Sequence, residues 1–203
     1  MKALNAFSNE KRIFSTKLLV CTAMLISICV VMLNTPIGTL RLPLVSVTIA
    51  HIPVLVAALV FGLKSGIIVG ISFGVTTMIM ALTMAVSPFD LLFINPLVSV
   101  LPRALIPITT FFSYRGLSSL LLGHLAGKTA AVATSILIGN LTNTFGVYTI
   151  IYIIYAQRLF EATGIPALQL IITAISTSTL FKAVIVVIIT TPIVLTLRRV
   201  VKP

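Results

Sequence analysis

The sequence has very few charged residues, and acids are the rarest of them. Only 3 of its 203 residues are Asp or Glu, and charged residues make up 8% of the chain against 59% hydrophobic ones. A typical soluble domain carries about 25% charged residues. Water could not solvate a surface of this composition, so a soluble globular fold is excluded.

The sequence also lacks the patterns that catalysis requires. It has no Gly-rich phosphate loop followed by Lys-Ser/Thr, no paired carboxylates within its apolar runs, and no partner for either histidine at metal-ligand spacing. Cys21 and Cys29 lie too far apart along one predicted helix for a disulfide, so we interpret them as packing residues. The absence of Trp removes one stacking option for a ligand. We therefore predict that the chain is not an enzyme and hydrolyses no ATP itself.

Long apolar runs dominate what is present. Backbone amides in hydrocarbon need internal partners, and these runs are too long for barrel strands, so they predict helices. We expect an all-α integral membrane protein in which residues 1–203 form one domain with six transmembrane helices. The expected spans are 16–33, 47–62, 66–84, 96–112, 130–155 and 168–197.

Breaks between the apolar runs indicate the connections. Residues 41–46 are too short to cross the membrane and predict a short extended segment in the first outer loop. Pro102 and Pro107 predict that the fourth helix is kinked or broken. Glycines at 62, 66, 70 and 74 recur every four residues and give one helical face a groove, which fits either packing within the chain or contact with another subunit.

The net charge of +11 is explained by membrane orientation better than by nucleic-acid binding, because the cations lie between apolar runs. Only Arg41 and Arg158 fall on one predicted side of the membrane. Ten cations fall on the other, namely Lys2, Lys11, Arg12, Lys17, Lys64, Arg115, Lys128, Arg198, Arg199 and Lys202. By the positive-inside rule both termini are expected in the cytoplasm, with the chain in the plasma membrane.

Two cations lie inside predicted spans, where no acid is available to neutralise them. Arg103 follows Pro102 in the fourth span, and Lys182 lies near the middle of the sixth. An unpaired charge in hydrocarbon is unfavourable, so both predict an anionic ligand. The alternatives for Arg103 are that it snorkels to the interface or donates to carbonyls that the prolines leave free.

Polar side chains follow one face of the fifth span and predict a cavity wall. They are Asn140, Asn143, Thr144 and Tyr148. A weaker stripe on the sixth span consists of Gln169, Thr173, Ser176 and Thr177, whose hydroxyls could instead bond to their own backbone. We interpret His51, just before Pro53, as a group that caps or satisfies local backbone.

Four segments resemble the substrate-binding S components of energy-coupling-factor (ECF) vitamin transporters. They are TIAHIPVLVAALVFGLKSGIIVGISFG (48–74), NPLVSVLPRALI (95–106), GNLTNT (139–144) and LFKAVI (180–185). The most specific parts are the HIP triplet with its Gly-spaced hairpin, the LPR element and the TNT element. Leu180 and Phe181 stand where the family more usually has an Asn before the Lys.

The resemblance implies a six-helix bundle that binds a vitamin near its outer face, with Asn95, Arg103, Asn143 and Lys182 in matching segments. It also implies three partners, a membrane-embedded coupling protein and two ATPases that use ATP and Mg, while this chain holds no cofactor. Small residues of the first helix contact the coupling protein in that family. In this chain, Ala23 and Ser27, which are four residues apart, would make that contact.

The substrate remains open at this point. The overall pattern is most similar to the pantothenate members, and a carboxylate suits the two cations. Folate, a pyridoxine-type vitamin or a thiamine precursor would also find hydrogen-bonding groups in Asn140, Asn143 and Gln169. A stand-alone secondary carrier should show an inverted repeat or intramembrane acids, and neither is visible. A structural scaffold leaves Arg103 unexplained.

Overall fold

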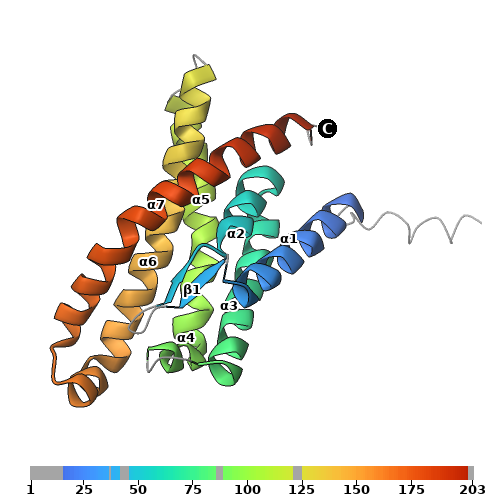
Figure 1. The fold of residues 1–203 in the computed structure, drawn as a ribbon. Helices are drawn as coiled ribbons and strands as arrows, with labels where there is room; N and C mark the ends of the chain where they lie inside the picture. Colours follow the sequence, from blue (N-terminus) through green and yellow to red (C-terminus); the bar gives the residue numbers. More distant parts are fainter. Residues whose placement is uncertain (1–15, 37, 42–45, 86–88, 121–124, 201–203) are drawn as a thin grey trace, which may run out of the picture.

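The computed structural model describes residues 16–36, 38–41, 46–85, 89–120 and 125–200. Within these residues the chain is a bundle of long helices with one small hairpin (Figure 1). The long helices are α1 (Thr16–Asn34), α3 (Leu63–Thr83), α5 (Leu101–Leu120), α6 (Leu125–Thr163) and α7 (Ala167–Val200).

Short elements connect the long helices. They are the strands β1 (Thr39–Arg41) and β2 (Ser46–Thr48), α2 (Ile52–Val56), the π-helix η2 (Ala57–Phe61), the 3-10 helix η3 (Asp90–Ile94) and α4 (Pro96–Ser99). The strands pair antiparallel, with Leu40 opposite Val47. The extended segment predicted at 41–46 is therefore part of a hairpin, although residues 42–45 lie outside the described residues.

Five helices in the described part of the chain are long and apolar enough to cross a membrane. α6 has 39 residues and α7 has 34. At 1.5 Å per residue these lengths are about 58 and about 51 Å, so both helices extend well beyond a hydrocarbon core of about 30 Å. The end of α5, the start of α6 and the end of α7 lie toward the top of Figure 1, whereas η3 and the α6–α7 connection lie toward the bottom.

The second predicted span, 47–62, differs most from the structure. Its first residues pair in β2, and the helix begins only at Ile52, with Pro53 in its first turn. α2 and η2 have five residues each, so together they measure about 15 Å, roughly half a hydrocarbon core. Gly62, at φ 94°, separates η2 from α3.

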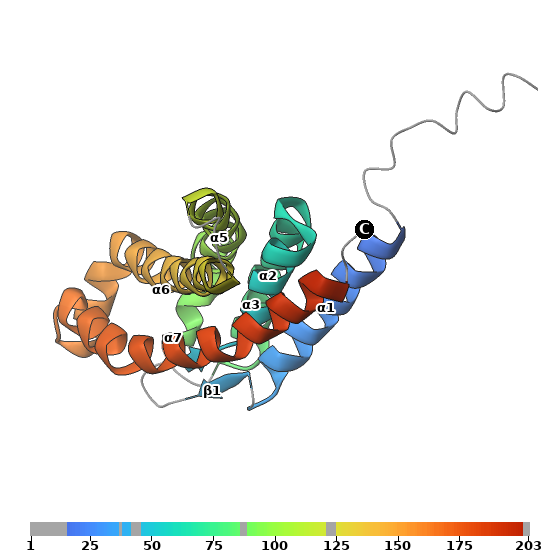
Figure 2. The ribbon, with the colours of Figure 1, turned by 90° about the horizontal axis from the view of Figure 1, so that it is seen from above.

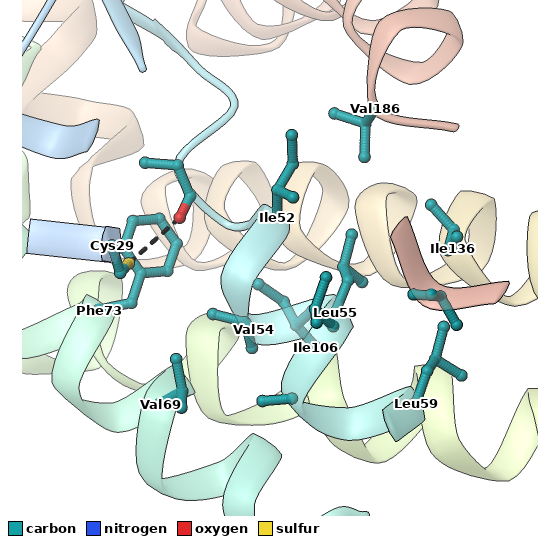
Figure 3. Packing of buried hydrophobic residues seen from close by; sticks show 14 of the residues in the cluster. Cys29, Ile52, Val54, Leu55, Leu59, Val69, Phe73, Ile106, Ile136 and Val186 are labelled. Carbon is teal, nitrogen blue, oxygen red and sulfur yellow. Dashed lines mark hydrogen bonds between the residues drawn. The ribbon is translucent and has the colours of Figure 1, made fainter. Parts of the chain in front are cut away.

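The core of the protein surrounds this short helix. α2 and η2 pack against α1, α3, α5 and α7, and the residues from Ile52 to Leu59 are all buried. Figure 3 shows Val54, Leu55 and Ile106 packed together, with the Cys29 thiol bonded to a backbone carbonyl. That carbonyl belongs to Ala50, 3.1 Å from the sulfur. Both cysteines are free thiols, and Cys29 is a packing residue of this core.

The glycines of α3 pack within the chain. An added Cβ on Gly66 would lie 2.7 Å from Pro107, one on Gly70 would lie 2.5 Å from the Arg103 carbonyl oxygen, and one on Gly74 would lie 2.7 Å from Val100. The groove predicted from their spacing therefore receives α4 and α5, which fits packing within the chain.

α7 lies along one side of the bundle, and Figure 2 shows it running from α6 toward α1 and α2. Near its end, Arg198 Nε donates to the Leu59 carbonyl at 2.8 Å, and its guanidinium lies 3.9 Å from the centre of the Tyr114 ring. Arg198 thus joins α7 to η2 and α5.

Candidate functional site

Arg103 is buried where α4 meets α5, with 3% of its surface exposed. Its Nη1 donates to the Val98 carbonyl at 2.7 Å. In a regular helix that carbonyl would accept from the backbone N–H four residues on, but that residue is Pro102, which has none. One alternative predicted for Arg103, donation to a carbonyl freed by a proline, is therefore present.

Aromatic rings cover the rest of the guanidinium. The centre of the Phe73 ring lies 5.4 Å from Cζ, and that of the Phe93 ring lies 4.9 Å away. Nε is buried and makes no hydrogen bond. The Arg103 guanidinium is therefore buried within the chain beside two aromatic rings and does not extend to the protein surface.

A pocket of about 80 Å³ lies beside Arg103. It is lined by Leu33, Thr39, Thr48, Thr77, Met80, Ala81, Met84, Asp90, Phe93 and Arg103. One cation, one acid and three hydroxyls thus meet at the junction of the hairpin, the end of α3, η3 and α5. Such a pocket can bind a small polar molecule through charge and hydrogen bonds while apolar side chains pack against the rest of it.

The pocket brings in residues that the sequence analysis did not select. Asp90 begins η3, and Thr39 and Thr48 belong to strands whose pairing hydropathy does not reveal. One feature of the sequence could have drawn attention to Asp90. It is one of three acids in the chain, and it lies five residues before Asn95, where the NPLVSVLPRALI segment begins.

Asn95 and Tyr148 hold neighbouring elements in place. Asn95 caps α4 by accepting from Leu97 N at 2.9 Å and donates to Tyr155 Oη at 3.2 Å. The Tyr148 ring meets Phe89 edge-on, with 6.5 Å between ring centres. Both contacts join α6 to the segment that supplies the pocket residues Asp90 and Phe93.

A second polar group lies between α6 and α7. Lys182, 8% exposed, donates to Thr144 Oγ1 at 2.8 Å. Asn140 and Asn143 on α6 are buried on the same helical face as Thr144. The stripe predicted on this helix therefore faces the interior and meets the intramembrane lysine.

Gln169 lies apart from both groups. It is exposed in the first turn of α7, and its carbonyl accepts from Thr173 Oγ1 at 2.8 Å. The side chains of Ser176 and Thr177 lie outside the described residues. The hydroxyl of Thr173 thus bonds to its own helix, the alternative stated for this stripe.

The capping part of the His51 interpretation is wrong. The residue precedes α2, but its ring makes no capping hydrogen bond, and the side chain is fully buried. The ring lies beside the Asn140 side chain and the Thr48 backbone, although neither ring nitrogen meets the distance and angle of a hydrogen bond to them. The position just before Pro53 suggested a cap and gave no sign that another helix would cover the residue.

Ala23 and Ser27 lie on an exposed part of α1, away from the buried residues Thr22, Cys29 and Leu33. Ser27 Oγ donates to the Ala23 carbonyl at 3.1 Å, so its hydroxyl bonds to its own helix. Small side chains with satisfied hydroxyls allow another helix to approach closely.

Comparison with known proteins agrees with this arrangement. No curated protein matches the chain. A solved structure titled for ThiT from Listeria monocytogenes serovar is similar in fold, with a TM-score of 0.65 and 17% identity over 88% of this chain and 93% of that chain. The family model described as "ECF transporter, substrate-specific component" matches residues 17–194. The chain therefore belongs to the family of ECF transporter substrate-specific components, the multi-pass membrane subunits that bind a small molecule and associate with coupling and ATPase subunits.

Proposed function

We propose that this chain binds a small vitamin with an anionic group, pantothenate in the first place, and presents it to an ECF coupling module. The observation that carries this proposal is the buried Arg103 guanidinium at the wall of a pocket. Its contact with Val98 uses one nitrogen, and its Nε makes no hydrogen bond. A ligand carboxylate in the pocket could accept hydrogen bonds from guanidinium nitrogens that do not bond to Val98, and Arg pairs with carboxylates in a fixed planar geometry.

The proposal includes the topology. Six passes, with α2 and η2 as a short buried second pass, place both termini in the cytoplasm. The described cations at one end of the bundle support this orientation, namely Lys17, Lys64, Arg115, Lys128, Arg198 and Arg199. Glu161 and Arg158 would lie outside. ATP and Mg would act in the two partner ATPases, and this chain would use no cofactor.

Asp90 favours a second candidate. Its carboxylate lines the same pocket as Arg103, so the pocket presents both signs of charge. A vitamin with a cationic or zwitterionic ring, such as a thiamine precursor, would use Asp90 where pantothenate uses Arg103.

Mass spectrometry of small molecules retained by the detergent-extracted protein tests these candidates, followed by isothermal titration with pantothenate, folate, pyridoxine and thiamine precursors. Pantothenate binding at micromolar Kd or below, weakened by Arg103→Gln and kept by Asp90→Asn, supports the first candidate. The reverse dependence supports the second. Absence of binding to every compound below millimolar concentration would contradict both.

A further inference from the structure

His51 is the most deeply buried ionisable side chain that the proposed function leaves unused. Its exposed surface is 0%, and both Nδ1 and Nε2 lack a hydrogen-bond partner. The residue stands at the junction between the hairpin and α2, where the chain turns inward into the core.

Other buried polar atoms of α6 and α7 also lack a hydrogen bond. They are both atoms of the Asn140 amide, Asn143 Oδ1 and Thr179 Oγ1. Asn140 lies beside the His51 ring, Asn143 is one turn further along α6, and Thr179 is one turn from Lys182 on α7. An unsatisfied histidine and an unsatisfied amide on another helix therefore lie side by side.

Packing alone does not explain this cluster. Other buried hydroxyls bond to their own helices, as Ser135 does to the Ala131 carbonyl at 2.6 Å and Thr110 to the Ile106 carbonyl at 2.7 Å. Thr190 Oγ1 and Thr191 Oγ1, further along α7, are buried without a hydrogen bond. Buried polar groups without partners are unfavourable and uncommon in folded proteins. Amide and imidazole groups that serve only the fold would be replaceable by apolar side chains of similar size.

The chain itself connects His51 to the Arg103 pocket. Thr48, three residues before His51, lines that pocket. The intervening segment is held to the first loop by bonds from Thr48 Oγ1 and Ile49 N to the Gly38 carbonyl, at 3.0 and 2.9 Å. Because His51 is fully buried and does not line the pocket, a molecule that contacts both Arg103 and His51 would require this part of the chain to move.

We propose that His51 is a substrate-contacting residue which, with Asn140, forms an uncharged hydrogen-bonding subsite for hydroxyl or amide groups of the ligand. This inference rests on the proposed function, in which Arg103 takes the anionic end. The two sites together select a carboxylate that carries hydroxyl or amide groups at its other end. Pantothenate has this chemistry, and a plain fatty acid does not.

The experiment compares His51→Leu and Asn140→Leu with Ser135→Ala, which removes a buried hydroxyl that is already satisfied. The unfolding temperature is measured for each ligand-free protein, and Kd is measured for pantothenate and for its analogue without hydroxyl groups. His51→Leu is expected to leave the unfolding temperature unchanged or raised and to weaken pantothenate binding about tenfold, with a smaller effect on the analogue.

Two results would overturn the inference. A fall of several degrees in the unfolding temperature of His51→Leu would show that His51 stabilises the fold. An unchanged affinity of this variant for pantothenate would show that His51 does not contact the ligand. These results differ from a failure of the proposed function, which appears as wild-type protein that binds no vitamin or binds independently of Arg103. If the wild-type protein binds no vitamin, the unfolding temperature of His51→Leu still shows whether His51 stabilises the fold or is a buried group without hydrogen bonds.

Discussion

Arg103 and the prolines beside it form one local unit. Pro102 leaves the Val98 carbonyl without its helical donor, and Arg103 Nη1 takes that place. Pro107 likewise leaves the Arg103 carbonyl without its helical donor. That carbonyl oxygen packs closely against Gly70, which has no side chain. The guanidinium is thus fixed in direction by the backbone before any ligand arrives, and fixed donors bind an anion with less loss of entropy.

Lys182 shows the opposite arrangement, because within the described part of the chain its ammonium donates to a single side-chain hydroxyl, that of Thr144. Thr144→Val should lower the free energy of unfolding by about 2 kcal/mol, since it leaves a buried charge without its acceptor. Chemical or thermal denaturation of the purified protein measures this. Thr142→Val is the control, because the Thr142 hydroxyl bonds only to the Ile138 carbonyl of its own helix. Equal losses for the two variants would show that the Lys182 contact contributes nothing.

At the scale of elements, the close contact between α3 and α5 positions the site. Gly70→Ala places a Cβ 2.5 Å from the Arg103 carbonyl oxygen, so the two helices must separate. We expect a loss of about 1–3 kcal/mol in stability and weaker substrate binding, because Arg103 moves with α5. Thermal unfolding and titration measure the two effects.

Gly116→Ala is the matched control for that substitution. Gly116 also lies within a helix, but an added Cβ would meet nothing within 4 Å. It should gain stability, by up to about 1 kcal/mol, because Ala favours a helix over Gly. A Gly70→Ala protein that is as stable as wild type and binds normally would show that the helices can separate without disturbing Arg103.

Hydropathy predicted the long helices well and the second predicted span, 47–62, poorly, for one physical reason. The residues from Ile52 to Leu59 are apolar on every side because other helices surround them, and hydropathy cannot tell such a helix from one in lipid. The pairing of β2 with β1 is a contact between segments that no periodicity predicts. The extra turns of α6 lie beyond the apolar run, where composition no longer marks a helix.

The candidate site was predictable only in part. A charge inside an apolar run made Arg103 and Lys182 visible, and spacing placed Asn140 and Asn143 on one face. The tertiary fold determines which elements lie around Arg103. Asp90 and the hairpin threonines could therefore not be predicted as pocket residues from the sequence. The same holds for the partner of Lys182, which is on another helix.

On the scale of the whole molecule, the exposed face of α1 that carries Ala23 and Ser27 is the surface that we propose for contact with the coupling subunit. Replacing both Ala23 and Ser27 by Leu should reduce co-purification with the coupling subunit, because bulky side chains prevent close helix approach. Substrate affinity should not change, since neither residue lines the pocket. Ile28→Phe adds bulk to a different exposed face of the same helix and serves as the control. Co-purification that the double variant leaves intact would place the contact elsewhere.

The most direct measurement is an isothermal titration of pantothenate into wild-type, Arg103→Gln and Arg115→Gln proteins. Arg115 is an exposed cation in the same helix, so it controls for the loss of one positive charge. If the Arg103 guanidinium binds the carboxylate of the substrate, Arg103→Gln should weaken binding by about 2 kcal/mol, which is roughly thirtyfold in Kd, and Arg115→Gln should not. Equal affinity in all three proteins would contradict the assignment of Arg103 to the substrate.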